Sequence, residues 1–136
     1  MKMDHVELFV PDRDEAADWY GRVLEFEVLE QHRHWATERG PLMISNDGGD
    51  TMVALFVGEP QGEAEVRGLR RLAFRVSAEE FVRFLERSGR WRDEPLGRDE
   101  IQDHDQAISV YFDDPWGTRL EVTTYEAEAA RAALGR

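Results

Sequence analysis

The chain has no cysteine among its 136 residues. This absence excludes disulfide bonds, catalysis by a thiolate, and zinc or iron–sulfur sites held by cysteine. Long apolar runs are missing as well, and a membrane-spanning helix needs about 18 such residues or more. The N-terminus has no recognisable signal peptide. We therefore expect a cytoplasmic protein that does not associate with a membrane.

Lysine is almost absent too, since Lys2 is the only one and every other basic residue is arginine. The 29 acidic residues outnumber the 17 basic ones, and the formal net charge is −12. Two explanations stay open: a halophile-like adaptation to a salty cytoplasm, or a GC-rich genome in which arginine codons replace lysine codons. In either case so acidic a surface argues against nucleic acid as a partner. At low ionic strength it would attract cationic ligands.

The same order of predicted secondary-structure elements occurs twice along the chain. Alternating apolar residues and helix-capping signals predict a strand, a helix and three further strands in each half. The first half is expected to have strands at 3–10, 26–34, 41–45 and 51–57, with a helix from Asp12 to Leu24. The second half is expected to have strands at 70–76, 94–98, 109–113 and 118–125, with a helix from Ser77 to Ser88.

These elements predict a single α+β domain over residues 1–136, in which two tandem βαβββ modules form a cupped, barrel-like mixed sheet. The expected parts are a first module at 1–58, a linker at 59–68, a second module at 69–125 and a C-terminal helix at 126–136. His5 and Arg71 hold the same place in the two halves, and so do Ala54 and Glu121. Because one helix covers one strand face in each half, these four side chains are expected to line a shared concave side.

The most informative stretch is a predicted hairpin near the C-terminus. Its turn reads Asp-Asp-Pro-Trp-Gly over residues 113–117, with a proline that presets φ and a glycine that tolerates positive φ. The returning strand alternates, so that Leu120, Val122 and Thr124 face one way and Glu121 faces the other. A carboxylate at mid-strand needs a partner, and this requirement makes Glu121 a candidate site residue.

Three motifs, in the right order over nearly the whole chain, resemble those of the vicinal oxygen chelate superfamily. The opening strand reads His5-Val6-Glu7-Leu8-Phe9-Val10, the second module opens with Leu72-Ala73-Phe74-Arg75-Val76, and the closing hairpin reads Ser109-Val110-Tyr111-Phe112-Asp113-Asp114-Pro115-Trp116-Gly117 before Leu120-Glu121. That superfamily includes glyoxalase I, bleomycin-resistance proteins, fosfomycin-resistance proteins and extradiol dioxygenases. The resemblance implies a paired-module fold and, commonly, a homodimer.

The resemblance also implies a divalent metal (Fe, Mn, Ni or Zn) held by one inward side chain from each of four strands. Those positions are His5, Ala54, Arg71 and Glu121, of which only His5 and Glu121 are usual ligand types. Ala54 has no donor atom, and the guanidinium of Arg71 is permanently charged and cannot ligate a cation. The two-histidine, one-carboxylate triad of the iron enzymes is therefore incomplete.

Three interpretations of Arg71 stay open. It can form a metal-free ion pair with Glu121, supplying the positive charge that a metal normally brings. It can also grip an anionic ligand group together with Arg75, while His5 contributes a hydrogen bond. A weak metal site on His5 and Glu121, completed by ligand or water, is the third.

Other residues are candidates on weaker grounds. By the resemblance, His104 with Tyr111 nearby is a candidate for catalytic proton transfer, although a loop histidine is more often merely solvated. His32 and His34 are two apart in a predicted strand and would share a face, as a metal pair or as an exposed polar surface. Met52 and Phe56 are candidates for an apolar ligand-binding wall, or for ordinary core.

These observations favour a small-molecule-binding protein of the glyoxalase/bleomycin-resistance type with a degenerate, metal-free site and no cofactor. Its expected partner is a small organic molecule. The alternative is a metal-dependent enzyme, a lyase or dioxygenase acting on a substrate with vicinal oxygens. A metal-free enzyme that uses His5, Arg71 and Glu121 as polar groups is the third hypothesis.

Overall fold

The computed structural model describes residues 3–60 and 69–135. The chain divides into two compact units, residues 1–63 and 64–136. The first contains β1 (His5–Val10), α1 (Arg13–Leu24), β2 (Glu27–Val28), a 3₁₀ helix η1 (Glu30–Trp35), β3 (Leu42–Ser45) and β4 (Met52–Val57). The second contains β5 (Leu72–Arg75), α2 (Ala78–Glu86), η2 (Ser88–Arg90), η3 (Arg98–Glu100), β6 (Ile101–Asp103), β7 (Ile108–Asp113), β8 (Arg119–Thr124) and α3 (Ala127–Leu134). Most of the predicted linker at 59–68 lies outside the described residues.

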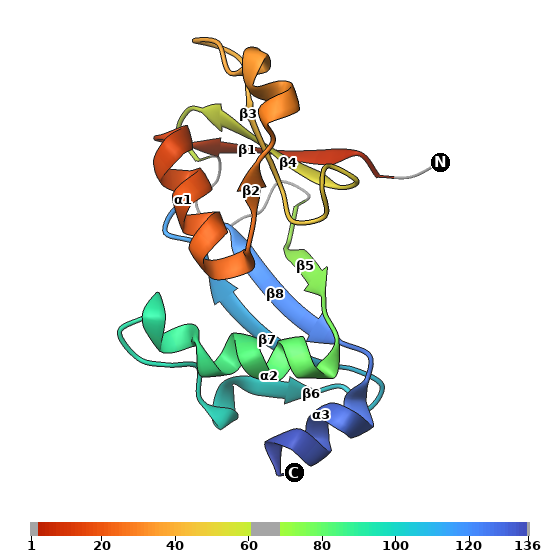
Figure 1. The fold of residues 1–136 in the computed structure, drawn as a ribbon. Helices are drawn as coiled ribbons and strands as arrows, with labels where there is room; N and C mark the ends of the chain where they lie inside the picture. The colour runs from red at the N-terminus through yellow and green to blue at the C-terminus, as the bar shows by residue number, and fades with distance from the viewer. Residues whose placement is uncertain (1–2, 61–68, 136) are drawn as a thin grey trace. The chain divides into compact units, whose positions relative to one another are not determined.

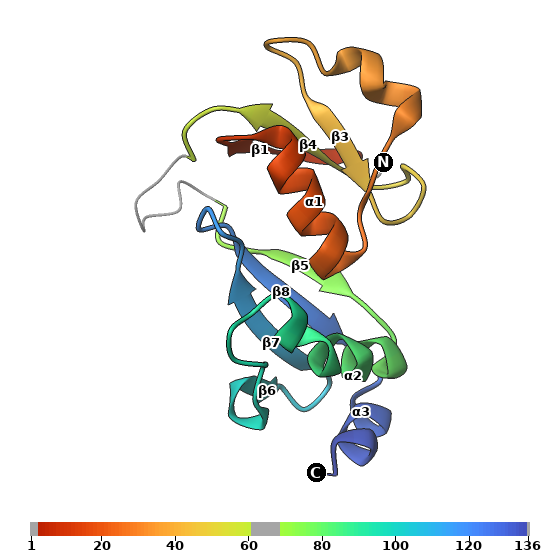
Figure 2. The same ribbon diagram turned by 60° about the vertical axis from the view of Figure 1, so that its left-hand side comes forward.

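Each unit is a βαβββ module around its own four-stranded mixed sheet (Figures 1 and 2). The strand order is β1-β4-β3-β2 in the first sheet and β5-β8-β7-β6 in the second. In both, the opening strand pairs in parallel with the closing strand, and the remaining pairs are antiparallel. The predicted α+β class with two tandem modules is confirmed. Hydrogen bonds between the described strands form these two sheets and do not close them into a barrel.

Strand register supports the predicted internal repeat. Glu7 pairs with Ala54 in the first sheet, and Ala73 pairs with Glu121 in the second. His5 precedes Glu7 by two residues, and Arg71 precedes Ala73 by two. His5 and Arg71 therefore hold matching places in the two modules, as the sequence predicts.

The core of each unit lies between its sheet and its helix. In the first, Val10, Tyr20 and Val23 are fully buried, and Asp12 caps α1 by accepting a hydrogen bond from the Glu15 backbone N–H. In the second, Ser77 opens α2 with a complete capping box. Within the described residues no helix is long and apolar enough to cross a membrane.

The strand predicted over 26–34 is wrong beyond its first residues. β2 ends at Val28, and the polar run Glu-Gln-His-Arg-His-Trp forms η1 instead. Residues three apart eclipse one another in a 3₁₀ helix, and two such pairs hold this one. Arg33 pairs with Glu30, and the His32 ring stacks on Trp35 at 4.1 Å. His32 and His34 therefore do not share a strand face as a metal pair would require.

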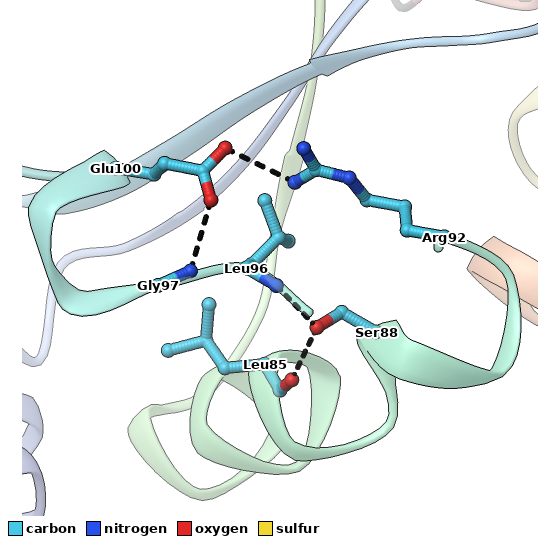
Figure 3. A network of polar contacts seen from close by, with 6 residues as sticks. All are labelled: Leu85, Ser88, Arg92, Leu96, Gly97 and Glu100. Atoms are coloured by element: carbon cyan, nitrogen blue, oxygen red, sulfur yellow. Dashed lines mark hydrogen bonds and ion pairs between the residues drawn. The ribbon is translucent and has the colours of Figure 1, made fainter. Parts of the chain in front are cut away.

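The segment after α2 also departs from prediction. The helix ends at Glu86 rather than Ser88, and the strand predicted at 94–98 begins only at Ile101. The reason is Ser88, whose buried hydroxyl donates to the Leu85 carbonyl (2.6 Å) and accepts from the Leu96 N–H (2.8 Å), as Figure 3 shows. These bonds tie an irregular segment to the end of α2.

Glu100 completes this network at the far end of the segment. Its carboxylate accepts from the Gly97 N–H (2.9 Å) and from Arg92 (3.1 Å; Figure 3). The Gly97 hydrogen bond, with Arg92 as the smaller contributor, holds the pKa of Glu100 below its ordinary value. The loop therefore keeps a fixed path before β6 starts.

The β7–β8 hairpin turns as predicted. Its turn is closed by the Gly117 N–H, which donates to the Asp114 carbonyl, and Gly117 has a φ of +87°. The Asp114 carboxylate accepts from the backbone N–H groups of Trp116 (2.9 Å) and Thr118 (2.7 Å). A buried acidic side chain thus holds the reversal.

Candidate functional site

The best candidate site in the second unit is the sheet face opposite α2. α2 packs on the face that carries Phe112, because the Phe84 and Phe112 rings lie 5.4 Å apart. The opposite face, which we call the open face, carries alternate residues of the three long strands with Arg71 just before β5. Its members are Arg71, Ala73, Arg75, Ser109, Tyr111, Asp113, Arg119, Glu121 and Thr123.

Arg71 lies over an aromatic ring at one end of this face. Its guanidinium carbon is 4.3 Å from the centroid of Tyr111. The Arg71 Nε is buried and has no hydrogen-bond partner in the described part of the chain. A cation over a π face is stabilised without using its N–H donors. The Arg71 Nε donor is thus unused within the described part of the chain.

Glu121 is held by a neighbouring strand rather than by an arginine. The Ser109 hydroxyl is 2.8 Å from Oε1 of Glu121 and 2.9 Å from Oγ1 of Thr123. A hydroxyl has one proton and an ionised carboxylate can only accept, so Ser109 donates to Glu121 and accepts from Thr123. The second carboxylate oxygen of Glu121 has no hydrogen bond within the described residues.

The predicted ion pair between Arg71 and Glu121 is absent from the ion pairs of the described residues. Register explains the difference. Tyr111 lies directly opposite Glu121, whereas Arg71 stands two residues before Ala73, the β5 partner of Glu121. The guanidinium therefore reaches the Tyr111 ring, and Ser109 satisfies the carboxylate. Sequence reasoning missed Ser109, although its two-residue spacing from Tyr111 places it on the same strand face.

His104 and Tyr111 meet, as the sequence hypothesis requires. Tyr111 Oη and His104 Nε2 are 2.8 Å apart. His104 lies in the β6–β7 turn, where its backbone N–H donates to the Ala107 carbonyl and Asp105 has a φ of +69°. This bond can pass a proton between imidazole and phenol. Their role in catalysis stays a prediction.

Arg75 forms a second arginine–tyrosine contact at the other end of the face. Its guanidinium carbon is 4.4 Å from the centroid of Tyr125, a ring that is 60% exposed. Ala73 separates the two arginines on the same strand face and is exposed. The open face therefore has two ring-supported cations with a small residue between them.

In the first unit, His5 lies at the start of β1 among carboxylates. Its Nδ1 is 2.7 Å from Asp4 Oδ2, and its Nε2 is 3.5 Å from Glu7 Oε1. The Asp4 hydrogen bond is the main reason that the pKa of His5 lies above its ordinary value of 6.5, and Glu7 contributes less. Sequence reasoning missed both carboxylates, although Glu7 shares a strand face with His5.

The same face of the first sheet carries an apolar cluster. Leu29, Met43, Met52 and Ala54 are buried together, and Phe56 packs against them. Phe56 also meets the half-exposed Phe9 edge to face, with ring centroids 6.3 Å apart. Met52 and Phe56 are thus part of one apolar surface, and ligand contact there stays a prediction.

The protonation of His5 is open to direct measurement. In a ¹H–¹³C NMR pH titration, Asp4→Asn should lower the pKa of His5 toward its ordinary value, because the leading hydrogen bond to the imidazolium is weakened. Since the folded pKa is raised, the stability that this contact contributes is present below about pH 6.5 and is lost as the pH rises through the raised value. Glu7→Gln is the matched control and should produce the smaller change. An equal pKa in wild type and Asp4→Asn would contradict the assignment.

The residues at the implied metal positions do not fit a metal site. Ala54 is enclosed by Met43, Met52 and Leu29, and Arg71 is a cation stacked on Tyr111. The imidazole of His5 is hydrogen-bonded by carboxylates that favour its protonated form, which cannot ligate. No group of three or more His, Cys, Asp or Glu side chains suited to a metal ion occurs in residues 3–60 and 69–135.

Comparison with known proteins places these modules in a family. Residues 2–122 match the model of the Glyoxalase/Bleomycin resistance protein/Dioxygenase superfamily. That match spans most of the chain, including both opening strands and the closing hairpin. Among curated proteins, none matches the sequence.

Several solved structures share the fold. A glyoxalase/dioxygenase from Nostoc punctiforme is similar with a TM-score of 0.70 and 19% identity, over 91% of this chain and 90% of that one. The fosfomycin resistance protein FosX from Listeria monocytogenes has a TM-score of 0.67 and 16% identity, over 96% and 98%. Lactoylglutathione lyase from Agrobacterium tumefaciens has a TM-score of 0.58 and 18% identity, over 93% and 94%. At these identities the likeness concerns the fold alone.

Proposed function

Since the chain belongs to the Glyoxalase/Bleomycin resistance protein/Dioxygenase superfamily, we propose that it binds a small organic molecule without a metal ion. The observation that carries this proposal is the contact of Arg71 with Tyr111, 4.3 Å from guanidinium carbon to ring centroid. By the resemblance, Arg71 stands where a metal-binding histidine is usual. The guanidinium of Arg71, which is always charged and cannot ligate a metal ion, occupies that position.

The ligand is proposed to contact the open face of the second sheet. Arg71 and Arg75 offer N–H donors, Glu121 offers an acceptor oxygen, and Tyr111 offers a hydroxyl and an aromatic face. A site with a few convergent polar groups is typical of small-molecule recognition. On the first sheet, His5, Met52 and Phe56 stay proposed contacts. A homodimer, common in the superfamily, is part of the same proposal.

The test is metal content together with thermal stability. Protein purified without a histidine tag or chelator should contain far less than one metal ion per chain by mass spectrometry. Ni, Zn, Mn and Fe(II) should leave its melting temperature unchanged, in wild type and in His5→Ala alike. The matched control is His34→Ala, which removes an exposed histidine of η1.

Near-stoichiometric metal that His5→Ala removes and His34→Ala retains would overturn the metal-free proposal. It would favour the alternative, a metal-dependent lyase or dioxygenase. The His104–Tyr111 hydrogen bond supports that second candidate, because a phenol and an imidazole in contact can move a proton during catalysis.

A further inference from the structure

We infer that the open face of the second sheet selects an organic anion, and that a carboxylate group of the ligand binds Arg71 and Arg75. This inference rests on the proposed small-molecule binding and specifies the charge of the ligand. It does not depend on the first unit, because every residue it uses belongs to the second.

Some arginines of this acidic chain form ion pairs with carboxylates, and others do not. Arg22, Arg33, Arg92 and Arg131 each pair with a carboxylate at 2.7–3.1 Å. Arg71 and Arg75 instead lie over tyrosine rings. Neither has a carboxylate partner within the described residues, although acidic residues outnumber basic ones 29 to 17. Other described arginines, such as Arg39 and Arg90, form no ion pair either, but Arg71 and Arg75 share one strand face and each lies over a tyrosine ring.

The Arg71 Nε is a buried donor without a hydrogen-bond partner in the described ranges. Leaving a buried charged donor unsatisfied is costly. A ligand carboxylate would satisfy it after a shift of the guanidinium that exposes Nε. The planar guanidinium offers paired N–H groups that match the two oxygens of a carboxylate.

The spacing of Arg71 and Arg75 determines how one ligand group can reach both. Arg71 and Arg75 flank Ala73 on one face of one strand, so their Cα atoms are separated by about 13 Å. Their guanidiniums lie over different rings, Tyr111 and Tyr125, so binding one carboxylate requires both side chains to turn toward Ala73. The exposed Ala73 leaves the room, and Tyr111 and Tyr125 provide flat apolar surfaces beside it.

Glu121 limits the charge that the face accepts. It pairs with Ala73 across the strands and carries its own negative charge next to that gap. A ligand of one negative charge would meet Arg71, Arg75 and Glu121 there, and Arg119 and Asp113 pair in register at the Arg71 end of the same face. The net charge of −12 opposes anions at long range, so anion binding at this face would require these local cations.

The test uses three planar probes of nearly equal shape: benzoate, benzamide and benzamidinium, with charges of −1, 0 and +1. Titrations followed by ¹⁵N NMR should place benzoate shifts at backbone amides of Ala73, Tyr111 and Glu121. Benzoate should bind about tenfold more tightly than benzamide, as expected for a charge-assisted hydrogen bond. Benzamidinium should not shift these amides.

Two arginine variants serve as a matched pair. Arg71→Gln should weaken benzoate binding about tenfold. Arg22→Gln changes the net charge by the same amount on α1 and should leave benzoate binding unchanged. Arg71→Lys keeps the positive charge but lacks the planar guanidinium, so its affinity for benzoate should lie between those of Arg71→Gln and Arg22→Gln. Spectral dispersion of each variant reports whether it is folded, and the comparison of probes on wild type needs no variant.

The outcomes separate this inference from the proposed function. Equal binding of benzoate and benzamide at these amides, or preference for benzamidinium, would overturn the anion inference and leave small-molecule binding standing. Equal weakening by Arg71→Gln and Arg22→Gln would overturn the role of Arg71. If none of the three probes shifts the open face, both the inference and the proposed binding surface are wrong.

Discussion

Asp114→Ala is expected to lower the free energy of unfolding of the second unit by about 3–4 kcal/mol. The side chain is 4% exposed, and its Oδ1 accepts two backbone hydrogen bonds, from Trp116 at 2.9 Å and Thr118 at 2.7 Å. Alanine would remove both acceptor contacts and leave two turn N–H groups without them. The carboxylate also fixes the turn that brings Glu121 opposite Tyr111, so the loss should disturb the candidate site.

The measurement is urea unfolding followed by circular dichroism and tryptophan fluorescence, with NMR to assign the transition to the second unit. Asp113→Ala is the matched control, because it removes an exposed neighbouring aspartate of the same turn. It should change the unfolding free energy by less than about 0.5 kcal/mol. Equal losses in the two variants would show that the turn does not depend on the Asp114 carboxylate.

Ser88→Ala is expected to lower the unfolding free energy of the same unit by about 2–3 kcal/mol. The side chain has no exposed surface, and its hydroxyl serves the Leu85 carbonyl and the Leu96 N–H at once (Figure 3). Alanine leaves a buried acceptor and a buried donor without this bridge. The tie between the end of α2 and the segment leading to β6 would be lost.

Hydrogen exchange gives this prediction a local readout. The Leu96 amide should exchange much faster in Ser88→Ala, while amides in the middle of α2 change only with the global stability. Glu86→Ala is the matched control, because it truncates an exposed side chain two residues earlier. Unchanged protection of Leu96 would mean that the hydroxyl is not what holds the segment.

Local signals in the sequence predicted much of this fold. Asp12 and Ser77 cap their helices as their spacing indicates, because a side-chain oxygen there reaches the third backbone N–H of the helix. Gly117 adopts the positive φ that its turn requires. The matching strand positions predicted for the two halves are also present in the two sheets. Strand register follows from the alternation of apolar residues when one face is buried.

The misses occur where interactions three residues apart, or between side chains, decide the outcome. The polar run 30–35 has no alternation of apolar and polar residues that would favour a strand. Its contacts between residues three apart therefore stabilise a 3₁₀ helix after β2 ends. The Ser88 hydroxyl holds the segment before β6 in an irregular path, so β6 begins later than predicted. The periodicity of apolar residues gives no information about such a hydrogen bond. The Tyr111 ring competes for Arg71, and that contact depends on strand register and rotamers that composition does not reveal.

The self-contained strand pairing of each module has a consequence for synthesis on the ribosome. Every strand of the first sheet lies between His5 and Val57, and every strand of the second lies between Leu72 and Thr124. A nascent chain therefore carries all partners of the first sheet before the second has begun to emerge. Within a module, however, the strand made first must wait for the strand made last. Translation must pass Val57 before β1 can pair with β4, and Thr124 before β5 can pair with β8.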